Sequence, residues 1–139
     1  MLDEVRALTV SRGDEIESIR VVWLQGRIAA GLRQTGEARN FLAQARREFA
    51  ARKMDYDVAL SLLEEAALLL AERRTAEVKG LAGELAVVFD SRGVHREALA
   101  ALRLFQQAAE MEQATAELAR RILRFLFRAQ YDQGLRFES

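Results

Sequence analysis

Cysteine and proline are both absent from this chain, and histidine occurs only once. Without cysteine, the chain can form no disulfide, no thiolate nucleophile and none of the usual structural zinc sites, which fits a reducing compartment. The single histidine, His95, lies in a charged turn with no second histidine or cysteine to share a metal ion. We therefore expect His95 to be an ordinary solvent-exposed residue.

Net charge is also lacking, since 21 basic residues balance 21 acidic residues. A protein without an overall field has no general attraction for nucleic acid or anionic lipid. No apolar run approaches the roughly 20 residues needed to span a bilayer, and the first residues lack the basic and apolar regions of a secretory signal. We expect a cytoplasmic protein that does not enter a membrane.

Motifs for catalysis are missing as well. Glu64 and Glu65 are adjacent, so they point in different directions on a helix and do not form a catalytic carboxylate pair. Asp55 and Asp57 suit the first turn of a helix, where the dipole favours negative charge. Residues 80–83 contain two glycines, but apolar residues separate them, unlike a phosphate-binding loop. We expect no enzyme activity, no cofactor and no metal site.

What the chain does contain is a high proportion of strong helix formers. Half of its 139 residues are hydrophobic and 30% are charged, with alanine, leucine, arginine and glutamate in heavy use. The length is that of one domain. These features predict an all-α protein in which residues 1–139 form a single domain.

A short motif of threonine, a small residue and glutamate occurs three times, beginning at Thr35, Thr75 and Thr115, with 40 residues between copies. Threonine is a good N-cap and the glutamate suits the first turn, so we expect helices to begin near residues 36, 76 and 116. Other positions keep the same interval: Arg12, Arg52 and Arg92; Glu17, Asp57 and Glu97; Phe49 and Phe89. A fixed interval of this size is typical of stacked repeats.

The spacing of apolar residues divides the chain into one short helix and three antiparallel helical hairpins joined by short turns. The predicted segments are an orphan second helix at 1–12, hairpins at 14–53, 54–92 and 94–133, and a tail at 134–139. Residues 76–91 are expected to form one helix that ends at Gly93 in a left-handed conformation. Residues 36–53 contain five basic and two acidic residues, whereas residues 54–72 contain five acidic residues and no basic one. These neighbouring helices of opposite charge are expected to pair.

Antiparallel helix pairs at a constant interval resemble the tetratricopeptide repeat family. In that family a small residue lies where the first helix crosses the second, and an alanine follows twelve residues later. The corresponding pairs here are Gly26 with Ala38, which match, Ala66 with Val78, which match loosely, and Gln106 with Leu118, which do not. The interval of 40 residues exceeds the usual ~34 of the family and the closing proline is absent, so a HEAT or armadillo arrangement, also near 40, is the alternative.

The stretches 75–78 and 93–99 look like the last repeats of large bacterial repeat proteins, some of which carry a regulatory domain ahead of the repeats. The resemblance implies a right-handed α-solenoid whose first helices line a concave groove. That groove would hold a segment of a partner protein or another domain of the same longer chain. The positions carried over to the groove are Arg20, Trp23, Arg27, Leu60, Leu63, Ala67, Leu70, Arg103, Gln107 and Glu110.

Within this predicted groove, Trp23 and its arginine neighbours are the strongest candidates for partner binding, because tryptophan and arginine are enriched in binding hot spots. The alternative for Trp23 is packing against the short helix before it. We expect a protein-interaction scaffold that uses this groove.

The last helix offers a second candidate surface. Leu123 and Phe127, four residues apart, form an apolar stripe beside the inward-facing one, and Tyr131 continues it. Because the end of a repeat array needs a polar outer face, we expect the tail at 135–137 or a second copy to cover the stripe. A homodimer through this helix is therefore the alternative function. A third hypothesis is nucleic-acid binding by the arginines of the same helix: Arg120, Arg121, Arg124 and Arg128.

Overall fold

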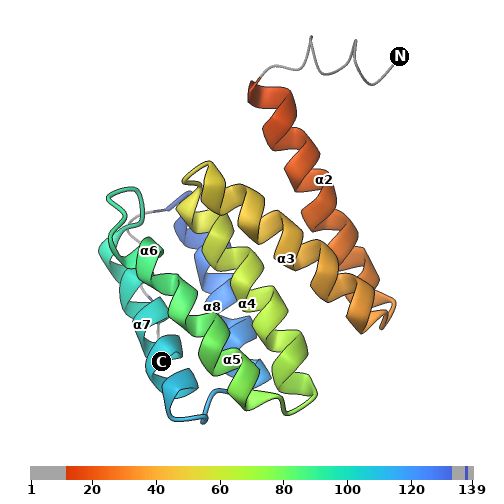
Figure 1. Ribbon diagram of the computed structural model, residues 1–139. Helices are drawn as coiled ribbons and strands as arrows, with labels where there is room; N and C mark the ends of the chain where they lie inside the picture. The colour runs from red at the N-terminus through yellow and green to blue at the C-terminus, as the bar shows by residue number, and fades with distance from the viewer. Residues whose placement is uncertain (1–11, 133–136, 138–139) are drawn as a thin grey trace.

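The computed structural model describes residues 12–132 and residue 137. Its helices are α2 (Arg12–Gly31), α3 (Thr35–Ala51), α4 (Asp55–Ala71), α5 (Thr75–Ala82), the 3₁₀ turn η1 (Gly83–Leu85), α6 (Ala86–Phe89), α7 (Arg96–Glu110) and α8 (Ala116–Ala129) (Figure 1). No strand occurs in the described part of the chain, and the prediction of an all-helical protein is confirmed. The predicted orphan helix and most of the tail lie outside the described residues.

Helix α4 lies at the centre of the molecule because it is apolar around nearly its whole circumference. The most extensive contacts of α4 are with α3 and α8, and α5 and α6 pack against it as well. Helix α7 joins the same group through α5 and α8. The hairpin of α2 and α3 lies on the outside, and the N-terminal half of α2 extends away from the other helices (Figure 1).

The core is continuous across the helices from α3 to α8. Its largest fully buried side chains include Phe49, Leu62, Phe105 and Leu126. These residues come from four different helices, α3, α4, α7 and α8. Burial of apolar surface is the main force that holds such helices together, because it removes roughly 25 cal/mol of unfavourable hydration per Å².

The helix starts differ from the threonine-capped prediction in two of three cases. Thr115 is an N-cap whose side chain accepts a hydrogen bond of 3.1 Å from the Leu118 N–H. Thr35 and Thr75 are instead the first residues of α3 and α5, whose N-caps, Gln34 and Arg74, make no side-chain cap bond. The tight turns before these two helices leave the threonines one position too late to cap them.

The helix predicted over 76–91 is also interrupted. The structure breaks it into α5, η1 and α6, with the 3₁₀ turn beginning at Gly83. Glycine is a poor helix former, and Gly80 and Gly83 lie close together at this point. The tighter turn still keeps Leu85 and Val88 fully buried in the core.

The left-handed turn residues are not glycines, contrary to the prediction for Gly93. The described residues with positive φ are Arg33, Lys53, Arg73 and Glu112, and none of the described glycines has a positive φ. All four of these turns are closed by a backbone bond to the carbonyl five residues earlier, such as Gln34 N–H to Ala29 O at 2.9 Å. This bond satisfies a carbonyl at the helix end and offsets the cost of roughly 1–2 kcal/mol of the left-handed residue.

Helices that are both long and apolar enough to cross a bilayer do not occur among the described residues.

The helix ends recur at intervals of about 40 residues. Helices α2, α4 and α7 end at Gly31, Ala71 and Glu110, and α3, α5 and α8 begin at Thr35, Thr75 and Ala116.

Candidate protein-interaction site

A buried carboxylate, Glu64, joins α2 to α4. Its side chain is only 9% exposed. The indole N–H of Trp23 donates a hydrogen bond of 2.8 Å to Oε2, and Nε of Arg27 lies 3.2 Å from Oε1. Trp23 and Arg27 are one turn apart on α2, so both reach the same carboxylate. The burial of Glu64 is therefore compensated on both of its oxygens.

The same two residues of α2 also contact α8. The ring of Trp23 stacks on the ring of Phe127, with centroids 5.6 Å apart and an interplanar angle of 29°. The guanidinium carbon of Arg27 lies 5.2 Å from the centroid of the Trp23 ring and 5.3 Å from that of Phe127. These contacts combine aromatic stacking with cation–π attraction. We name Trp23, Arg27, Glu64 and Phe127 the α2–α4–α8 cluster.

Burial dominates the ionisation of Glu64. Loss of hydration raises the pKa of this carboxyl group from 4.5 to about 7, although the charge of Arg27 and the hydrogen bond from Trp23 both act to lower it. Burial also raises the pKa of Asp57 and of Glu65, against the lowering effect of Arg20 and Arg46 respectively. Near neutral pH, the α2–α4–α8 cluster therefore contains a carboxyl group that is close to half protonated.

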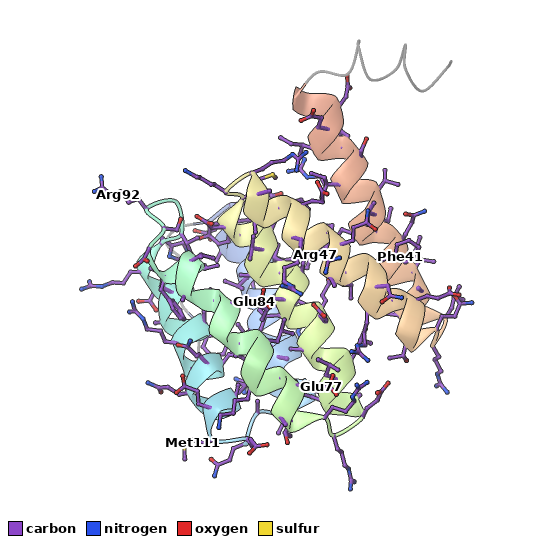
Figure 2. The ribbon with its side chains drawn as sticks, in the orientation of Figure 1. Phe41, Arg47, Glu77, Glu84, Arg92 and Met111 are labelled. Carbon is purple, nitrogen blue, oxygen red and sulfur yellow. The ribbon has the colours of Figure 1, made fainter. Side chains whose placement is uncertain are left out.

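A second buried ion pair lies on the side of α4 that faces α3. Arg46, 8% exposed, places Nε 3.1 Å from Oε2 of Glu65 and Nη1 2.7 Å from Oε1 of Glu84. Its neighbour Arg47 is exposed on α3 (Figure 2). The predicted pairing between the basic helix and the acidic helix is confirmed by Arg46 and Glu65. Because these groups are satisfied by one another, their role is to join α3, α4 and η1.

Beside the α2–α4–α8 cluster lies a cavity of about 280 Å³. Four helices contribute to it: α2, α3, α4 and α8. Its lining combines apolar residues with three charged ones: Ala30, Gly31, Leu42, Ala67, Leu68 and Leu123; Arg27, Glu64 and Arg120. Ligand sites are concave, mostly apolar and equipped with a few polar groups that set orientation. This cavity has that character at the small end of the usual size range.

The predicted groove residues are not gathered along one open groove. Arg27 and Ala67 line the cavity, whereas Leu63 and Leu70 are buried in the core. The physical reason is that α8 packs against α4, so the face of α4 expected to be open is covered by the last helix of the same chain. Leu60 is buried as well.

The remaining groove residues lie away from the cavity. Arg20 is exposed and forms a long ion pair of 3.5 Å with Glu17. On α7, Arg103 lies over the ring of Phe89 at 5.2 Å, and Gln107 is exposed. These positions on α2 and α7 are not brought together with the cavity.

The residues of the predicted dimer surface have three different environments. Leu123 is half-buried and lines the cavity, and Phe127 is half-buried under Trp23. Tyr131 is 86% exposed. Leu123 and Phe127, which were expected to be covered by the tail or by a second copy, instead lie against α2 of the same chain. Of the arginines on α8, Arg120, Arg124 and Arg128 are exposed, while Arg121 lies over the Phe137 ring at 5.7 Å.

The site residue that sequence reasoning dismissed is Glu64. The available signal was its position inside a helix that is apolar on nearly all sides, since a charge in such a helix must find a partner.

His95 also differs from expectation: it is half-buried, and its ring lies 6.5 Å from the ring of Tyr56. Its backbone N–H donates to the Tyr56 hydroxyl at 3.4 Å.

No group of three histidine, aspartate or glutamate side chains among the described residues is arranged to hold a metal ion. No protein-family model matches the sequence, and comparisons with curated proteins and with solved structures found no similar protein.

Proposed function

We propose that this chain is a protein-interaction module that binds a segment of a partner protein, or of another domain of a longer chain, at the cavity between α2, α3, α4 and α8. The observation that carries the proposal is the composition of that cavity, which has apolar walls and a charged side chain at several points of its lining. One apolar side chain of the partner segment would occupy it. The site lies one helical turn from Trp23.

The charges around the cavity favour a partner segment that contains an acidic residue. Arg27 and Arg120 both line the cavity and are exposed to solvent, whereas Glu64 is buried and already bonded to Trp23 and Arg27. An acidic residue next to the apolar anchor would meet the two guanidinium groups, which favour carboxylates. The preferred ligand is therefore an apolar side chain followed or preceded by aspartate or glutamate.

Binding rather than catalysis is favoured by the state of the buried charges. Glu64 and Glu65 each pair with an arginine of a neighbouring helix, so both carboxylates serve to join helices of the fold. A cytoplasmic location belongs to the same proposal and is supported by the absence of cysteine.

The wider architecture that we propose is a repeat array of the tetratricopeptide type. The recurrence of helix ends at about 40 residues supports it, as does the close crossing of Gly26 with α3. In this proposal α8 is the terminal helix that packs back on α4. The chain would then be part of a larger bacterial regulatory protein.

The experiment uses a displayed library of random peptides, selected against the immobilised protein. Gly31→Leu adds a side chain at the cavity wall, where the new Cβ atom meets nothing within 4 Å. Gly80→Leu is the matched control, since its Cβ also meets nothing within 4 Å and residue 80 is not among the cavity residues. We expect selected peptides to carry an apolar residue beside an acidic one.

For those peptides, Gly31→Leu and Arg120→Glu should each weaken binding about tenfold or more, or about 1.4 kcal/mol, and Gly80→Leu should leave it unchanged. Peptides that bind all variants equally would place the site elsewhere. Strong binding of single-stranded nucleic acid that falls steeply with salt, and falls with Arg124→Glu, would instead favour the third hypothesis.

A further inference from the structure

Helix α2 carries apolar residues on two opposite faces. The inner face includes the buried residues Ile19 and Ala29. The outer face carries four large apolar side chains that are half exposed or more: Val21 at 55%, Leu24 at 50%, Ile28 at 54% and Leu32 at 65%. Their spacing of three, four and four residues places them in one line along the helix. We name these four residues the outer stripe.

The outer stripe is a concentration of exposed apolar surface. The other large exposed apolar residues of the described chain are Val87, Leu104, Met111 and Tyr131, which lie on separate elements or turns. Met111 lies at the periphery of the molecule in Figure 2. Single exposed apolar residues are normal on any protein, whereas a contiguous apolar line marks a contact surface.

The corresponding face of α4 shows what this fold does with such a surface. Aligning the ends of α2 and α4 places Val21 opposite Ser61 and Leu24 opposite Glu64. Ser61 and Glu64 are both buried, and Glu64 is covered by Trp23 and Arg27 of the preceding hairpin. On α4 this face is therefore a helix-packing face, and on α2 the same face has no helix over it among the described residues.

Charge along α2 indicates the occupant. Glu17 lies one helical turn before the first residue of the outer stripe, and Arg33 directly follows the last one. Both residues are exposed. Within residues 12–132, the ion pair of Glu17 is a long surface contact of 3.5 Å with Arg20. In an antiparallel pair of α2 helices, Glu17 of each copy lies near Arg33 of the other, whereas a parallel pair would bring like charges together. The charges at the two ends of α2 therefore complement those of a second α2 helix only when the two helices are antiparallel.

We propose that the outer stripe pairs with the outer stripe of a second copy, with the two α2 helices antiparallel about a two-fold axis near Leu24 and Ile28. A two-fold contact of this kind uses the same patch on both copies and closes as a dimer. It leaves the cavity beside the α2–α4–α8 cluster open, because the cavity lies on the inner side of α2. A contact of one helix per copy is expected to bury less than the about 800 Å² per partner of a standard interface, so we expect a weak dimer that forms only as the concentration rises.

The test measures the mass of the full chain by sedimentation equilibrium over a range of concentrations. The expected result is a shift from 15.7 kDa toward twice that mass as the concentration rises. Leu24→Glu and Ile28→Glu should each weaken the dimer about a hundredfold, since a charge is buried in the contact. Val87→Glu is the matched control, because Val87 is equally exposed but lies on α6, and it should dimerise like the parent chain.

Charge reversal tests the antiparallel geometry. Glu17→Arg and Arg33→Glu should each weaken the dimer several-fold, and the double variant should restore it, since the two cross-pairs are then re-formed with exchanged signs. A mass that stays at 15.7 kDa at every concentration overturns the proposal, and means that another part of the chain or a different partner covers the stripe. A dimer that persists in Leu24→Glu overturns it as well, and a double variant no tighter than the single variants overturns the antiparallel arrangement.

Discussion

The indole N–H of Trp23 and the carboxylate of Glu64 are joined by a hydrogen bond of 2.8 Å, although 41 residues separate them in the chain. Trp23 is the only tryptophan of the protein. The indole therefore reports optically on the ionisation of the carboxyl group that anchors α2 to α4.

The first prediction concerns pH. In the unfolded chain Glu64 has a pKa near 4.5, and in the folded chain burial raises it to about 7. Between these values the folded state holds a proton that the unfolded state has released, so the free energy of unfolding falls as the pH rises through this window. The contribution of Glu64 is fully present below pH 4.5 and amounts to roughly 3 kcal/mol.

Glu64→Gln removes this titration and keeps an acceptor for the Trp23 N–H. In the parent protein, Trp23 fluorescence should change with a midpoint near pH 7, and urea unfolding should show a decline in stability from pH 5 to pH 7. In Glu64→Gln the fluorescence transition should disappear and the decline should become shallower. Identical fluorescence titrations in the two proteins would show that Glu64 ionises as an ordinary surface carboxyl.

The second prediction concerns the buried ion pair between α3 and α4. Arg46→Ala leaves the carboxylate of Glu65 buried without its main partner, whereas Glu84, which is half exposed, can be hydrated. Breaking a buried pair from one side costs about 3–5 kcal/mol. Arg47→Ala changes the adjacent exposed residue and should alter stability by less than about 0.5 kcal/mol. Urea denaturation measures both, and similar losses for the two variants would contradict a buried pair.

The third prediction concerns the crossing of α2 and α3. A Cβ atom at Gly26 would lie 2.9 Å from Cγ of Leu42 and 3.1 Å from Cβ of Phe41. Both atoms are close to the α3 backbone, so the helices must separate to admit a methyl group. The overpacking cost of about 1–3 kcal/mol exceeds or cancels the gain of about 1 kcal/mol in helix propensity.

Gly26→Ala should therefore lower the free energy of unfolding by about 1 kcal/mol. Gly80→Ala provides the contrast, because its Cβ meets nothing within 4 Å and only the propensity gain of up to about 1 kcal/mol remains. Thermal or urea unfolding of the two variants measures the difference. If Gly26→Ala is as stabilising as Gly80→Ala, the two helices are not in the close contact described.

Several local features follow from the residues alone. The helical class follows from composition and apolar spacing, and the pairing of basic α3 with acidic α4 follows from the sign of their charges, as Arg46 and Glu65 show. Gly26 was identified as a close crossing point through the resemblance to the tetratricopeptide pattern, in which an alanine, here Ala38, follows the small crossing residue by twelve positions. Each of these inferences depends on residues within one hairpin or in neighbouring helices.

Only part of the candidate site could be predicted from the sequence. Arg27 and Ala67 were predicted to face a partner and do line the cavity. Glu64 was not predicted, because nothing in the local sequence shows that the helix over it supplies an indole N–H and a guanidinium. The capping threonines were misplaced by one residue at Thr35 and Thr75, because the length of a tight turn depends on how the helices dock.

Composition and apolar spacing are enough to predict that the chain is helical, where most of its described helices lie to within a few residues, and which helix is too apolar to be anywhere but the centre. Helical spacing has this power because it specifies which side chains share a face. Tertiary structure alone decided that α8 covers α4, that Trp23 stacks on Phe127 and that the outer stripe of α2 is left exposed. An apolar face can be covered equally well by many helices, and only the packing of the whole chain selects one.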